Sequence, residues 1–454
     1  MAAHITKTNG TLKKYILRFA NEHIDFRLPE LQSLLSFFNI PVKYDKNFGE
    51  EPYVFVETDN EEDIHKLMSR TFLIRSAVEY WASGTSYQQL HENLKKLSPS
   101  FVKPFQSIDQ SFKVCVEAYG KKLTLKYKVQ RIDKLEFMAF DGPIDLNNPD
   151  NTFYLLEFYG MNPNEASEQP VMTYFGRLIR HGQRRKIIDF SLKKRKFIGN
   201  TSMDAGLSLI MANQAHVKEG SIIIDPFVGT GSLLVAAAEY GAYVMGTDID
   251  YKTLHGLGKP TRSKQKQREI DENIKNNLRQ YNLESQYLDV IVADASLPLW
   301  KEDFKFDAVI TDPPYGIREA TERIGTSKNY RLNDEHSKNH IPSKIDYSLG
   351  TLVGDLLNFA AKYLHMNGCL VYWLPVYKED YNEECIPTHP CLKLVANSEQ
   401  ELTEHTSRRL ITMEKIKEFS SDKAEVHEMT DSFRKKYFQP IEKEKFNRPK
   451  IIKS

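Results

Sequence analysis

The sequence is poor in the features that mark secreted and membrane proteins. Only four of its 454 residues are cysteine, and no two of them have CxxC spacing. No run of 18 consecutive apolar residues occurs, and the first ten residues hold no apolar core. We therefore expect no disulfide framework, no bound metal, no membrane span and no secretory signal. A reducing compartment, cytosolic or nuclear, is the default, and we expect a cytoplasmic location.

The chain also lacks an excess of charge of either sign. Its 62 Lys and Arg residues stand against 61 Asp and Glu residues, which leaves a net charge of +1. Hydrophobic residues make up 41% and charged residues 27% of the chain, as in ordinary globular proteins. A nucleic-acid partner must therefore be argued from local charge alone.

Two patterns divide the chain, whose length predicts two or three domains. Strand-like and helical stretches mix without steady alternation up to about residue 190, which predicts an α+β domain. Apolar strand runs then alternate with helices, which predicts an α/β domain with a buried, mostly parallel sheet. A polar stretch follows, either a solvated tail or a weak RNA-binding tail. The predicted domains are 1–190, 191–415 and 416–454.

The expected elements can be given by residue range. In the first domain we expect a helix opening at Pro29, a helical stretch over 61–80, and strands at 12–19, 53–57, 112–118, 152–158 and 171–179. In the second domain we expect strands at 221–225, 242–248, 288–294, 306–312, 368–374, 391–396 and 408–413.

Four successive strand runs in the second domain end in an aspartate. Aspartate is a common turn residue, so one such ending carries little weight. In α/β sheets, however, ligands bind beyond the carboxyl ends of the strands. Four endings in a row therefore indicate a polar ligand along this edge. The four residues are Asp225, Asp248, Asp294 and Asp312.

A glycine-rich turn, DPFVGTG at 225–231, lies between the first of these strands and a helix. Gly229 and Gly231 would let the backbone approach a ligand closely. Such a loop alone is a weak signal, because a nucleotide-binding Rossmann enzyme could also carry it. This loop, however, lacks the third glycine of the GxGxxG pattern, and it lacks the GK[ST] ending of a phosphate-binding loop. The Asp225 carboxylate could accept a hydrogen bond from an amino group or bind through water to a methionine-like moiety.

The next aspartates along the chain could bind the ribose and the base of a nucleoside. Asp248 ends the next strand, where a carboxylate commonly receives two ribose hydroxyls, and Asp250 is a rival for that role. Asp294 could accept from an adenine amine. Helix capping and turn formation remain alternatives for each of them.

The most specific motif is Asp312-Pro313-Pro314-Tyr315. Two prolines hold the loop extended, so that Asp312 and the Pro313 carbonyl can both point outward as acceptors. Two acceptors can grip the hydrogens of one NH₂ group, and Tyr315 can stack on the base that carries it. The lone pair of an exocyclic amine is a poor nucleophile, so positioning and electrostatics would supply most of the rate. Asp312 could also take the leaving proton.

With these motifs, and with the stretch 197–204 (FIGNTSMD) leading into LSLIMAN, the chain resembles amino-methyltransferases fused to a THUMP domain. It is most similar to the catalytic subunits of eukaryotic tRNA guanosine-10 N2-methyltransferases. The resemblance implies a Rossmann-like class I methyltransferase domain with a seven-stranded sheet, and a tRNA-binding THUMP domain in front of it. It further implies S-adenosylmethionine as cofactor, N2-methylguanosine in tRNA as product, and a small zinc-binding activator protein as partner in a heterodimer.

The resemblance also implies roles for single residues. Thr201 and Asp204 would cap a helix beside the cofactor, although a plain capping pair is an equal alternative. The methionine part of the cofactor would lie against Asp225, Phe227, Gly229, Thr230 and Gly231, the ribose against Asp248, and the adenine against Asp294 and Ala295. The target amine would lie against Asp312, Pro313, Pro314 and Tyr315.

Local charge points to RNA. Between residues 177 and 196 nine basic residues stand against the single acid Asp189, with Tyr174 and Phe175 just upstream. A basic stripe near aromatic residues fits a phosphate backbone, and a solvated surface is the alternative. The basic run 251–268 could equally be an RNA-contacting insertion or a disordered loop. The nine residues are Arg177, Arg180, Arg184, Arg185, Lys186, Lys193, Lys194, Arg195 and Lys196.

Other functions share parts of this pattern. DNA adenine-N6 methyltransferases carry the same tetrapeptide but have a separate base-recognition domain. Protein glutamine methyltransferases have a similar loop but need no basic stripe. A non-catalytic RNA-binding protein would not need the intact motifs.

The polar residues 317–346, which follow the tetrapeptide, are expected to form a loop that closes over the target base.

Overall fold

The computed structural model describes residues 12–325 and 343–438. The chain divides into two compact units, residues 1–191 and 192–454, while the sequence placed the first boundary after residue 190. Each unit is described by itself. Within the described residues no helix is both long and apolar enough to cross a membrane.

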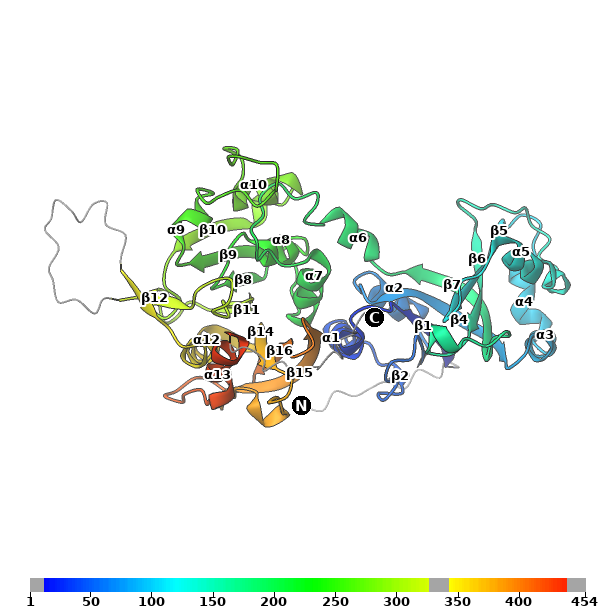
Figure 1. Ribbon diagram of the computed structural model, residues 1–454. Coiled ribbons are helices and arrows are strands. Elements are labelled where there is room, and N and C mark those ends of the chain that lie inside the picture. Colours follow the sequence, from blue (N-terminus) through cyan, green and yellow to red (C-terminus); the bar gives the residue numbers. More distant parts are fainter. Residues whose placement is uncertain (1–11, 326–342, 439–454) are drawn as a thin grey trace, which may run out of the picture. The chain divides into compact units, whose positions relative to one another are not determined.

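The first unit is an α+β domain built on a seven-stranded sheet (Figure 1). Its strands are β1 (Lys13–Phe19), β2 (Lys43–Tyr44), β3 (Tyr53–Thr58), β4 (Ile74–Gly84), β5 (Phe112–Tyr119), β6 (Asn151–Phe158) and β7 (Met172–His181). Its α-helices are α1 (Arg27–Phe37), α2 (Glu61–Met68), α3 (Tyr87–Lys95), α4 (Pro99–Val102), α5 (Leu125–Asp133) and α6 (Arg184–Asp189). The strand order is β2-β3-β1-β4-β7-β6-β5, and β5 with β6 is the parallel pair among otherwise antiparallel neighbours. The five strands predicted for this unit are confirmed.

The helical stretch predicted over residues 61–80 is wrong in its second half. Helix α2 ends at Met68, and the long strand β4 begins at Ile74. The buried Glu30 carboxylate accepts hydrogen bonds from the Thr71 hydroxyl and from the backbone amides of Phe72 and Leu73, each at 2.9 Å. A residue more than 40 positions away therefore stabilises the turn that separates helix from strand, and local periodicity cannot show such a contact.

The second unit has a seven-stranded sheet with helices on both faces (Figure 1). Its strands are β8 (Ile222–Asp225), β9 (Tyr243–Asp248), β10 (Tyr287–Val292), β11 (Phe306–Thr311), β14 (Leu364–Tyr377), β15 (Leu392–Glu401) and β16 (Thr406–Lys415). Its α-helices are α7 (Ala205–Gln214), α8 (Ser232–Ala238), α9 (Tyr251–Leu254), α10 (Ile274–Gln280), α12 (Leu349–Tyr363) and α13 (Glu428–Phe438). The order β10-β9-β8-β11-β14-β16-β15 has parallel neighbours from β10 to β14, and β16 is antiparallel to both of its neighbours. The predicted α/β fold is thus confirmed.

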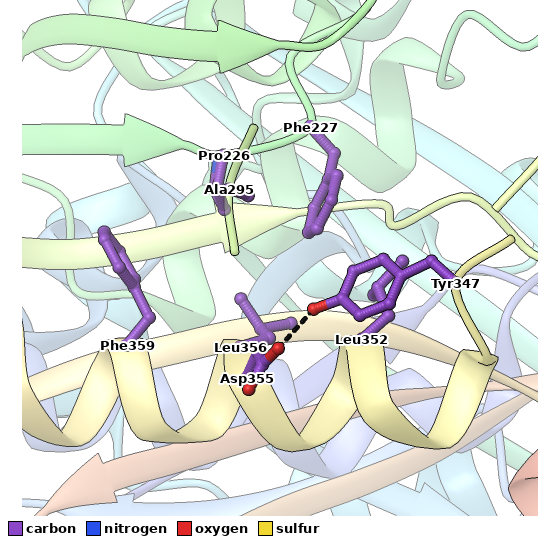
Figure 2. Close-up of a pocket in the computed structure, with 8 residues that line it drawn as sticks. All are labelled: Pro226, Phe227, Ala295, Tyr347, Leu352, Asp355, Leu356 and Phe359. Atoms are coloured by element: carbon purple, nitrogen blue, oxygen red, sulfur yellow. Dashed lines mark hydrogen bonds between the residues drawn. The ribbon is translucent and has the colours of Figure 1, made fainter. Parts of the chain in front are cut away.

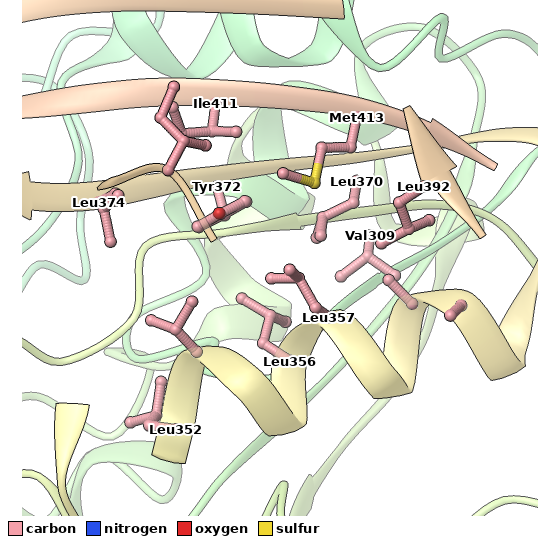
Figure 3. Packing of buried hydrophobic residues seen from close by; sticks show 14 of the residues in the cluster. Val309, Leu352, Leu356, Leu357, Leu370, Tyr372, Leu374, Leu392, Ile411 and Met413 are labelled. Carbon is pink, nitrogen blue, oxygen red and sulfur yellow. The ribbon is translucent and has the colours of Figure 1, made fainter. Parts of the chain in front are cut away.

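A large apolar core fixes this sheet against α12 (Figure 3). Leu352, Leu356 and Leu357 recur at helical spacing and are at most 3% exposed. They face Leu370 and Ile411 on neighbouring strands, both fully buried. Because the core holds β11 and β14 rigidly, the loops at their carboxyl ends are held in place as well.

The segment predicted as a polar tail is partly structured. Helix α13 packs on α12: Phe433 is 2% exposed, and the Asp431 carboxylate accepts a 2.7 Å hydrogen bond from the Gly350 amide. The prediction of a separate tail from residue 416 is therefore wrong for residues up to 438, because apolar side chains of α13 join the core. Residues 439–454 of that tail lie outside the described residues.

The predicted loop at 317–346 starts and ends in paired strands. Strands β12 (Glu322–Ile324) and β13 (Lys344–Asp346) form an antiparallel hairpin. Residues 326–342, the middle of the loop expected to close over the base, lie outside the described residues.

Candidate active site

The four strand-end aspartates meet at one cavity of about 920 Å³. Asp225 and Asp248 are the last residues of β8 and β9, and Asp294 and Asp312 follow β10 and β11 closely. All four line the cavity, as do Phe227, Gly229, Thr230 and Ala295. This convergence follows from the parallel order of the strands, which sends their carboxyl ends to the same edge. Most of the residues that the sequence predicted for the cofactor and for the target amine therefore line one cavity.

The glycine-rich turn is held by hydrogen bonds to its neighbours. The Gly229 amide donates to Asp248 Oδ2 at 2.8 Å, and the Thr230 hydroxyl lies 2.6 Å from the Ser202 hydroxyl. Gly231, which does not line the cavity, has φ 75°, and a Cβ there would lie 2.7 Å from the Ile274 side chain. A side chain at position 231 would therefore strain the backbone and clash with α10.

Asp248 and Asp250 both line the cavity but make different contacts with the chain. Asp250 caps α9, where its carboxylate accepts from the Lys252 amide at 2.9 Å and from the Thr253 hydroxyl at 2.7 Å. Asp248 accepts from the Gly229 and Asp250 amides, and burial raises the pKa of its carboxyl. A carboxylate oxygen has two lone pairs, so Asp248 retains capacity for a ligand hydroxyl in the cavity. The contact of Asp248 with a ribose stays a prediction, and Asp250 remains its rival.

Asp225 lines the cavity and also connects two strands of the sheet. Its Oδ1 accepts from the Thr311 hydroxyl at 2.6 Å and from the Phe227 amide at 3.0 Å, which joins the ends of β8 and β11. The residue is 2% exposed, and burial raises the pKa of its carboxyl to about 7. Burial therefore favours the protonated form of this carboxyl.

Asp294 ties the cavity to the β12–β13 hairpin. Its Oδ1 accepts from the amide and hydroxyl of Ser296 at 2.9 and 2.7 Å, and its Oδ2 accepts from the Ile324 amide at 2.6 Å. Asp294 is 4% exposed. Its predicted contact with an adenine amine must share these oxygen atoms with the backbone.

Beside Ala295 a small apolar pocket opens between the glycine-rich turn and α12 (Figure 2). Phe227 and Tyr347 line it from one side, and Phe359 from the helix. The Tyr347 hydroxyl donates to Asp355, which holds this ring beside Phe227. Phe227 therefore lines both this small pocket and the main cavity.

In the Asp-Pro-Pro-Tyr loop, the Asp312 carboxylate bonds to a tyrosine hydroxyl and to an arginine. The Tyr315 hydroxyl donates to Asp312 Oδ1, and Arg408 Nη1 donates to Asp312 Oδ2 at 3.3 Å. Burial raises the pKa of the Asp312 carboxyl, and the Arg408 cation and the Tyr315 hydroxyl act in the opposite direction. The Asp312 side chain is 23% exposed and lines the cavity, where it can meet a ligand. Pro313 and Pro314 line the cavity beside it.

Several lining residues were missed from the sequence. Arg408 lies on β16, almost 100 residues after Asp312, and Phe433 and Tyr437 lie on α13 in the supposed tail. The sequence signal for Arg408 was only a basic residue within an apolar strand run. Thr201, expected in a helix cap, instead donates to Glu319 at 3.3 Å, while Asp204 caps α7 through the amides of residues 206 and 207.

The basic stripe is less uniform than predicted. Arg195 is 2% exposed, and its Nη1 donates to the Ser232 hydroxyl at 2.9 Å, so its assignment as an RNA contact is wrong. Arg177 is paired with Glu61 and Glu79 inside the first unit. Arg177 thus pairs with carboxylates of its own unit, and Arg195 bonds to the first residue of α8.

The other basic residues keep more contact with solvent. Arg184 pairs with Glu22, and Lys186 is half-buried. Arg262 and Arg268 of the run 251–268 bond to backbone carbonyls, whereas its lysines are exposed. The exposed members of the stripe are Arg180, Arg185, Lys193, Lys194 and Lys196.

The fold and the site define a class. A seven-stranded sheet with one antiparallel strand, a glycine-rich turn after β8 and Asp-Pro-Pro-Tyr after β11 are the features of an S-adenosylmethionine-dependent methyltransferase of the class I fold. Family models agree: "Tmrp11 THUMP N-terminal domain" matches residues 13–184, and "RMKL-like, methyltransferase domain" matches residues 193–339.

Curated relatives narrow the class to one family. The tRNA (guanine(10)-N(2))-methyltransferase TRMT11 of Bos taurus is 49% identical over 445 residues, which cover 96% of this chain and 97% of the bovine protein. The Dictyostelium discoideum protein of the same name is 38% identical over 90% of this chain and 83% of its own length. The chain belongs to the TRMT11 family of tRNA (guanine(10)-N(2))-methyltransferases. Among solved structures, TrmN from Thermus thermophilus matches with a TM-score of 0.43 and 16% identity over 89% of this chain and all of its own.

Proposed function

We propose that this chain transfers the methyl group of S-adenosylmethionine to the N2 amine of guanosine 10 in tRNA. The relatives' names supply the base and the position. The observation that carries the chemistry is that Asp312 and Pro313 both line the cavity, so that the carboxylate and the Pro313 carbonyl would be the two acceptors. These two acceptors match the two hydrogens of one exocyclic amine.

The residues of the cavity fit the cofactor. A volume of about 920 Å³ leaves room for both a nucleoside cofactor and a flipped base. Asp248 would hold the ribose, Asp294 with Ala295 would face the adenine, and the glycine-rich turn with Asp225 would face the methionine part. The bound cofactor supplies an electrophilic methyl group on sulfur.

The chain's own groups would do the rest. Asp312 and the Pro313 carbonyl would hold the amine hydrogens, which shifts electron density to nitrogen and aims its lone pair. Tyr315 would stack on the base that leaves its helix, at a cost of a few kcal/mol. The proton released by the amine could pass to Asp312, whose ionised form is favoured by Arg408.

Matched tRNA transcripts test this proposal. Wild-type enzyme, prepared with its activator protein, should methylate a transcript with guanosine at position 10, and the digested product should be N2-methylguanosine. Inosine at position 10 keeps the ring but lacks the exocyclic amine, so methylation there should be lost. Equal methyl incorporation into the inosine transcript, or N6-methyladenosine as product, would contradict the proposal.

The activator partner has a candidate surface on the catalytic unit. Among the strands of the described residues, β10 is an edge of the sheet, and Leu288, Ile291 and Val292 on it are 48%, 41% and 41% exposed. An unpaired apolar edge strand readily pairs with a strand from another chain. We propose that the small activator protein docks there. The opposite edge, β15, contains Gln400 and is followed by Leu402, and both residues line the cavity, so a partner there would obstruct the entering base.

The two edges provide a matched test of this partner site. Ile291→Lys should abolish co-purification with the co-expressed activator protein, because it places a charge on the docking strand. Val395→Lys on β15, where the wild-type side chain is 53% exposed, should leave it intact. The opposite pattern would assign the partner to β15.

A cytoplasmic location stays a prediction, and fluorescence microscopy of the tagged chain would test it.

A further inference from the structure

Arg408 contacts the predicted catalytic loop from another strand of the same sheet. Its Nη1 lies 3.3 Å from Asp312 Oδ2 and 3.3 Å from the Tyr315 hydroxyl. It comes from β16, the antiparallel strand, whereas the loop follows β11. The Arg408 side chain is 13% exposed and lines the same cavity. A cation is therefore built into the place where the amine would be held.

Contacts other than Asp312 fix the position of this guanidinium. Nε donates to Gln400 Oε1 at 2.8 Å, and the guanidinium carbon lies 3.9 Å from the centre of the buried Trp373 ring. Nη2 lies 3.5 Å from the Met203 sulfur. The bonds to the loop, at 3.3 Å, are longer than the usual 2.7–2.9 Å of charge-assisted bonds. Contacts outside the loop therefore help to orient the Arg408 guanidinium toward Asp312, as electrostatic preorganisation requires.

We propose that Arg408 is a positioning residue for methyl transfer, which holds the Asp312 carboxylate in place by direct contact and keeps it ionised. This inference rests on the proposed role of the Asp-Pro-Pro-Tyr loop. Asp312 must accept hydrogens from the amine, and a protonated carboxyl in this partly buried place would lose part of that capacity. An opposite charge within 4–6 Å lowers an aspartate pKa by about 1–3 units.

Among residues 12–325 and 343–438, few other ionisable groups act on Asp312. Tyr315 belongs to the same loop, and Asp225 at the end of β8 repels it electrostatically. From α13, Arg434 lies against Gly316, the next residue after the tetrapeptide. Arg408 is the cation that bonds directly to the Asp312 carboxylate in the described part of the chain.

The neighbouring arginine provides a matched control. Arg409 also pairs with a carboxylate, Glu399 at 3.1 Å, and also lies over an aromatic ring, Tyr381 at 4.6 Å. Its side chain is 12% exposed, close to the value for Arg408. Successive residues of a strand point to opposite faces, so Arg409 points away from the cavity. A loss due only to strand stability should appear for both residues.

The test is the single-turnover rate of methyl transfer to tRNA as a function of pH, measured on the complex with the activator protein. Arg408→Met should lower the rate at neutral pH at least tenfold. It should also move the acidic limb up by about 1–3 pH units, with cofactor and tRNA affinities unchanged. Arg408→Lys, which keeps the charge without the fork, should keep the wild-type limb with a reduced rate. Arg409→Met should match wild type.

Three results would overturn the inference: a wild-type acidic limb in Arg408→Met, a limb shift in Arg408→Lys as large as in Arg408→Met, or an equal loss of rate in Arg409→Met. If Arg408→Met no longer binds cofactor, Arg408→Gln, which keeps a donor without the charge, must show the same upward shift. Asp312→Ala separates the role of the loop from the role of Arg408. Full activity of Asp312→Ala would remove the proposed role of the loop itself, whereas an inactive Asp312→Ala beside an unchanged Arg408→Met would contradict only the role of Arg408.

Discussion

Asp248 and Gly229 are joined by a 2.8 Å hydrogen bond from the glycine amide to Oδ2 of the carboxylate. The bond links the end of β9 to the glycine-rich turn after β8, so two parts of the proposed cofactor site are held together by the chain's own atoms. The same carboxylate accepts from the Asp250 amide at 2.8 Å. Asp248 therefore connects the geometry of the turn with the predicted ribose contact.

Asp248→Ala should weaken S-adenosylmethionine binding by about 1.5–3 kcal/mol, the cost of losing a hydrogen bond to a charged group. Asp250→Ala is the matched control, because Asp250 serves as a helix cap. It should cost about 1 kcal/mol of stability and little cofactor affinity. Isothermal titration calorimetry on both variants distinguishes the two roles. Unchanged affinity in Asp248→Ala with a loss in Asp250→Ala would transfer the ribose role to Asp250.

Asp225 should make the stability of the ligand-free protein depend on pH. Burial raises the pKa of its carboxyl from 3.8 to about 7, so between these values the folded chain binds more protons than the unfolded chain. The contribution of Asp225 is therefore most favourable below about pH 4, falls as pH rises to about 7, and is constant above. The total change is at most roughly 4 kcal/mol.

Asp225→Asn isolates this effect, because the hydrogen bonds from Thr311 and Phe227 both fall on Oδ1 of the carboxylate, and an amide oxygen can accept them. Urea unfolding at several pH values should show wild type losing stability relative to Asp225→Asn between about pH 4 and pH 7. A constant difference across this range would mean that Asp225 titrates as an ordinary carboxyl.

The exposed part of the basic stripe should contribute to tRNA binding. The triple change of Arg185, Lys193 and Lys194 to Gln should weaken binding. It should also reduce the slope of log affinity against log salt by roughly 0.7–0.9 for each phosphate that is no longer neutralised. Arg185, whose side chain is 82% exposed, and the two lysines lie at the surface. Cofactor affinity is the internal control. An unchanged slope would identify the stripe as a solvated surface.

Arg195→Met should behave in the opposite way. Arg195 is buried and donates to the Ser232 hydroxyl at the start of α8, so the substitution should cost about 1.5–3 kcal/mol of stability. The salt slope of tRNA binding should stay at the wild-type value. Thermal unfolding and filter binding on one preparation provide both readouts, and a reduced slope at normal stability would restore Arg195 as an RNA contact.

The sequence predicted most of this site because its signals are local. Parallel strands bring Asp225, Asp248, Asp294 and Asp312 to one edge, and each of them stands at or just after a strand end in the sequence. Arg408 could not be predicted in the same way, because β16 reaches Asp312 only through the antiparallel return of the chain.

Burial explains the errors. Arg195 looked like a member of a basic surface, yet its guanidinium lies beneath α8. The strand β4 looked helical because the turn before it depends on the distant Glu30. Phe433 was placed in a tail because α13 is polar on its other face and its apolar residues are few. In each case the deciding interaction is tertiary.

The most direct test of the proposed function is nucleoside mass spectrometry of purified tRNAs from cells that lack this gene and are complemented with wild type or with Asp312→Ala. Wild type should restore N2-methylguanosine. Asp312→Ala at equal protein level should not, because the transfer rate should fall by about a hundredfold or more, which corresponds to about 2.7 kcal/mol of transition-state stabilisation. Its affinities for cofactor and tRNA should stay near those of wild type. Full restoration of N2-methylguanosine by Asp312→Ala would contradict the assignment of the active site.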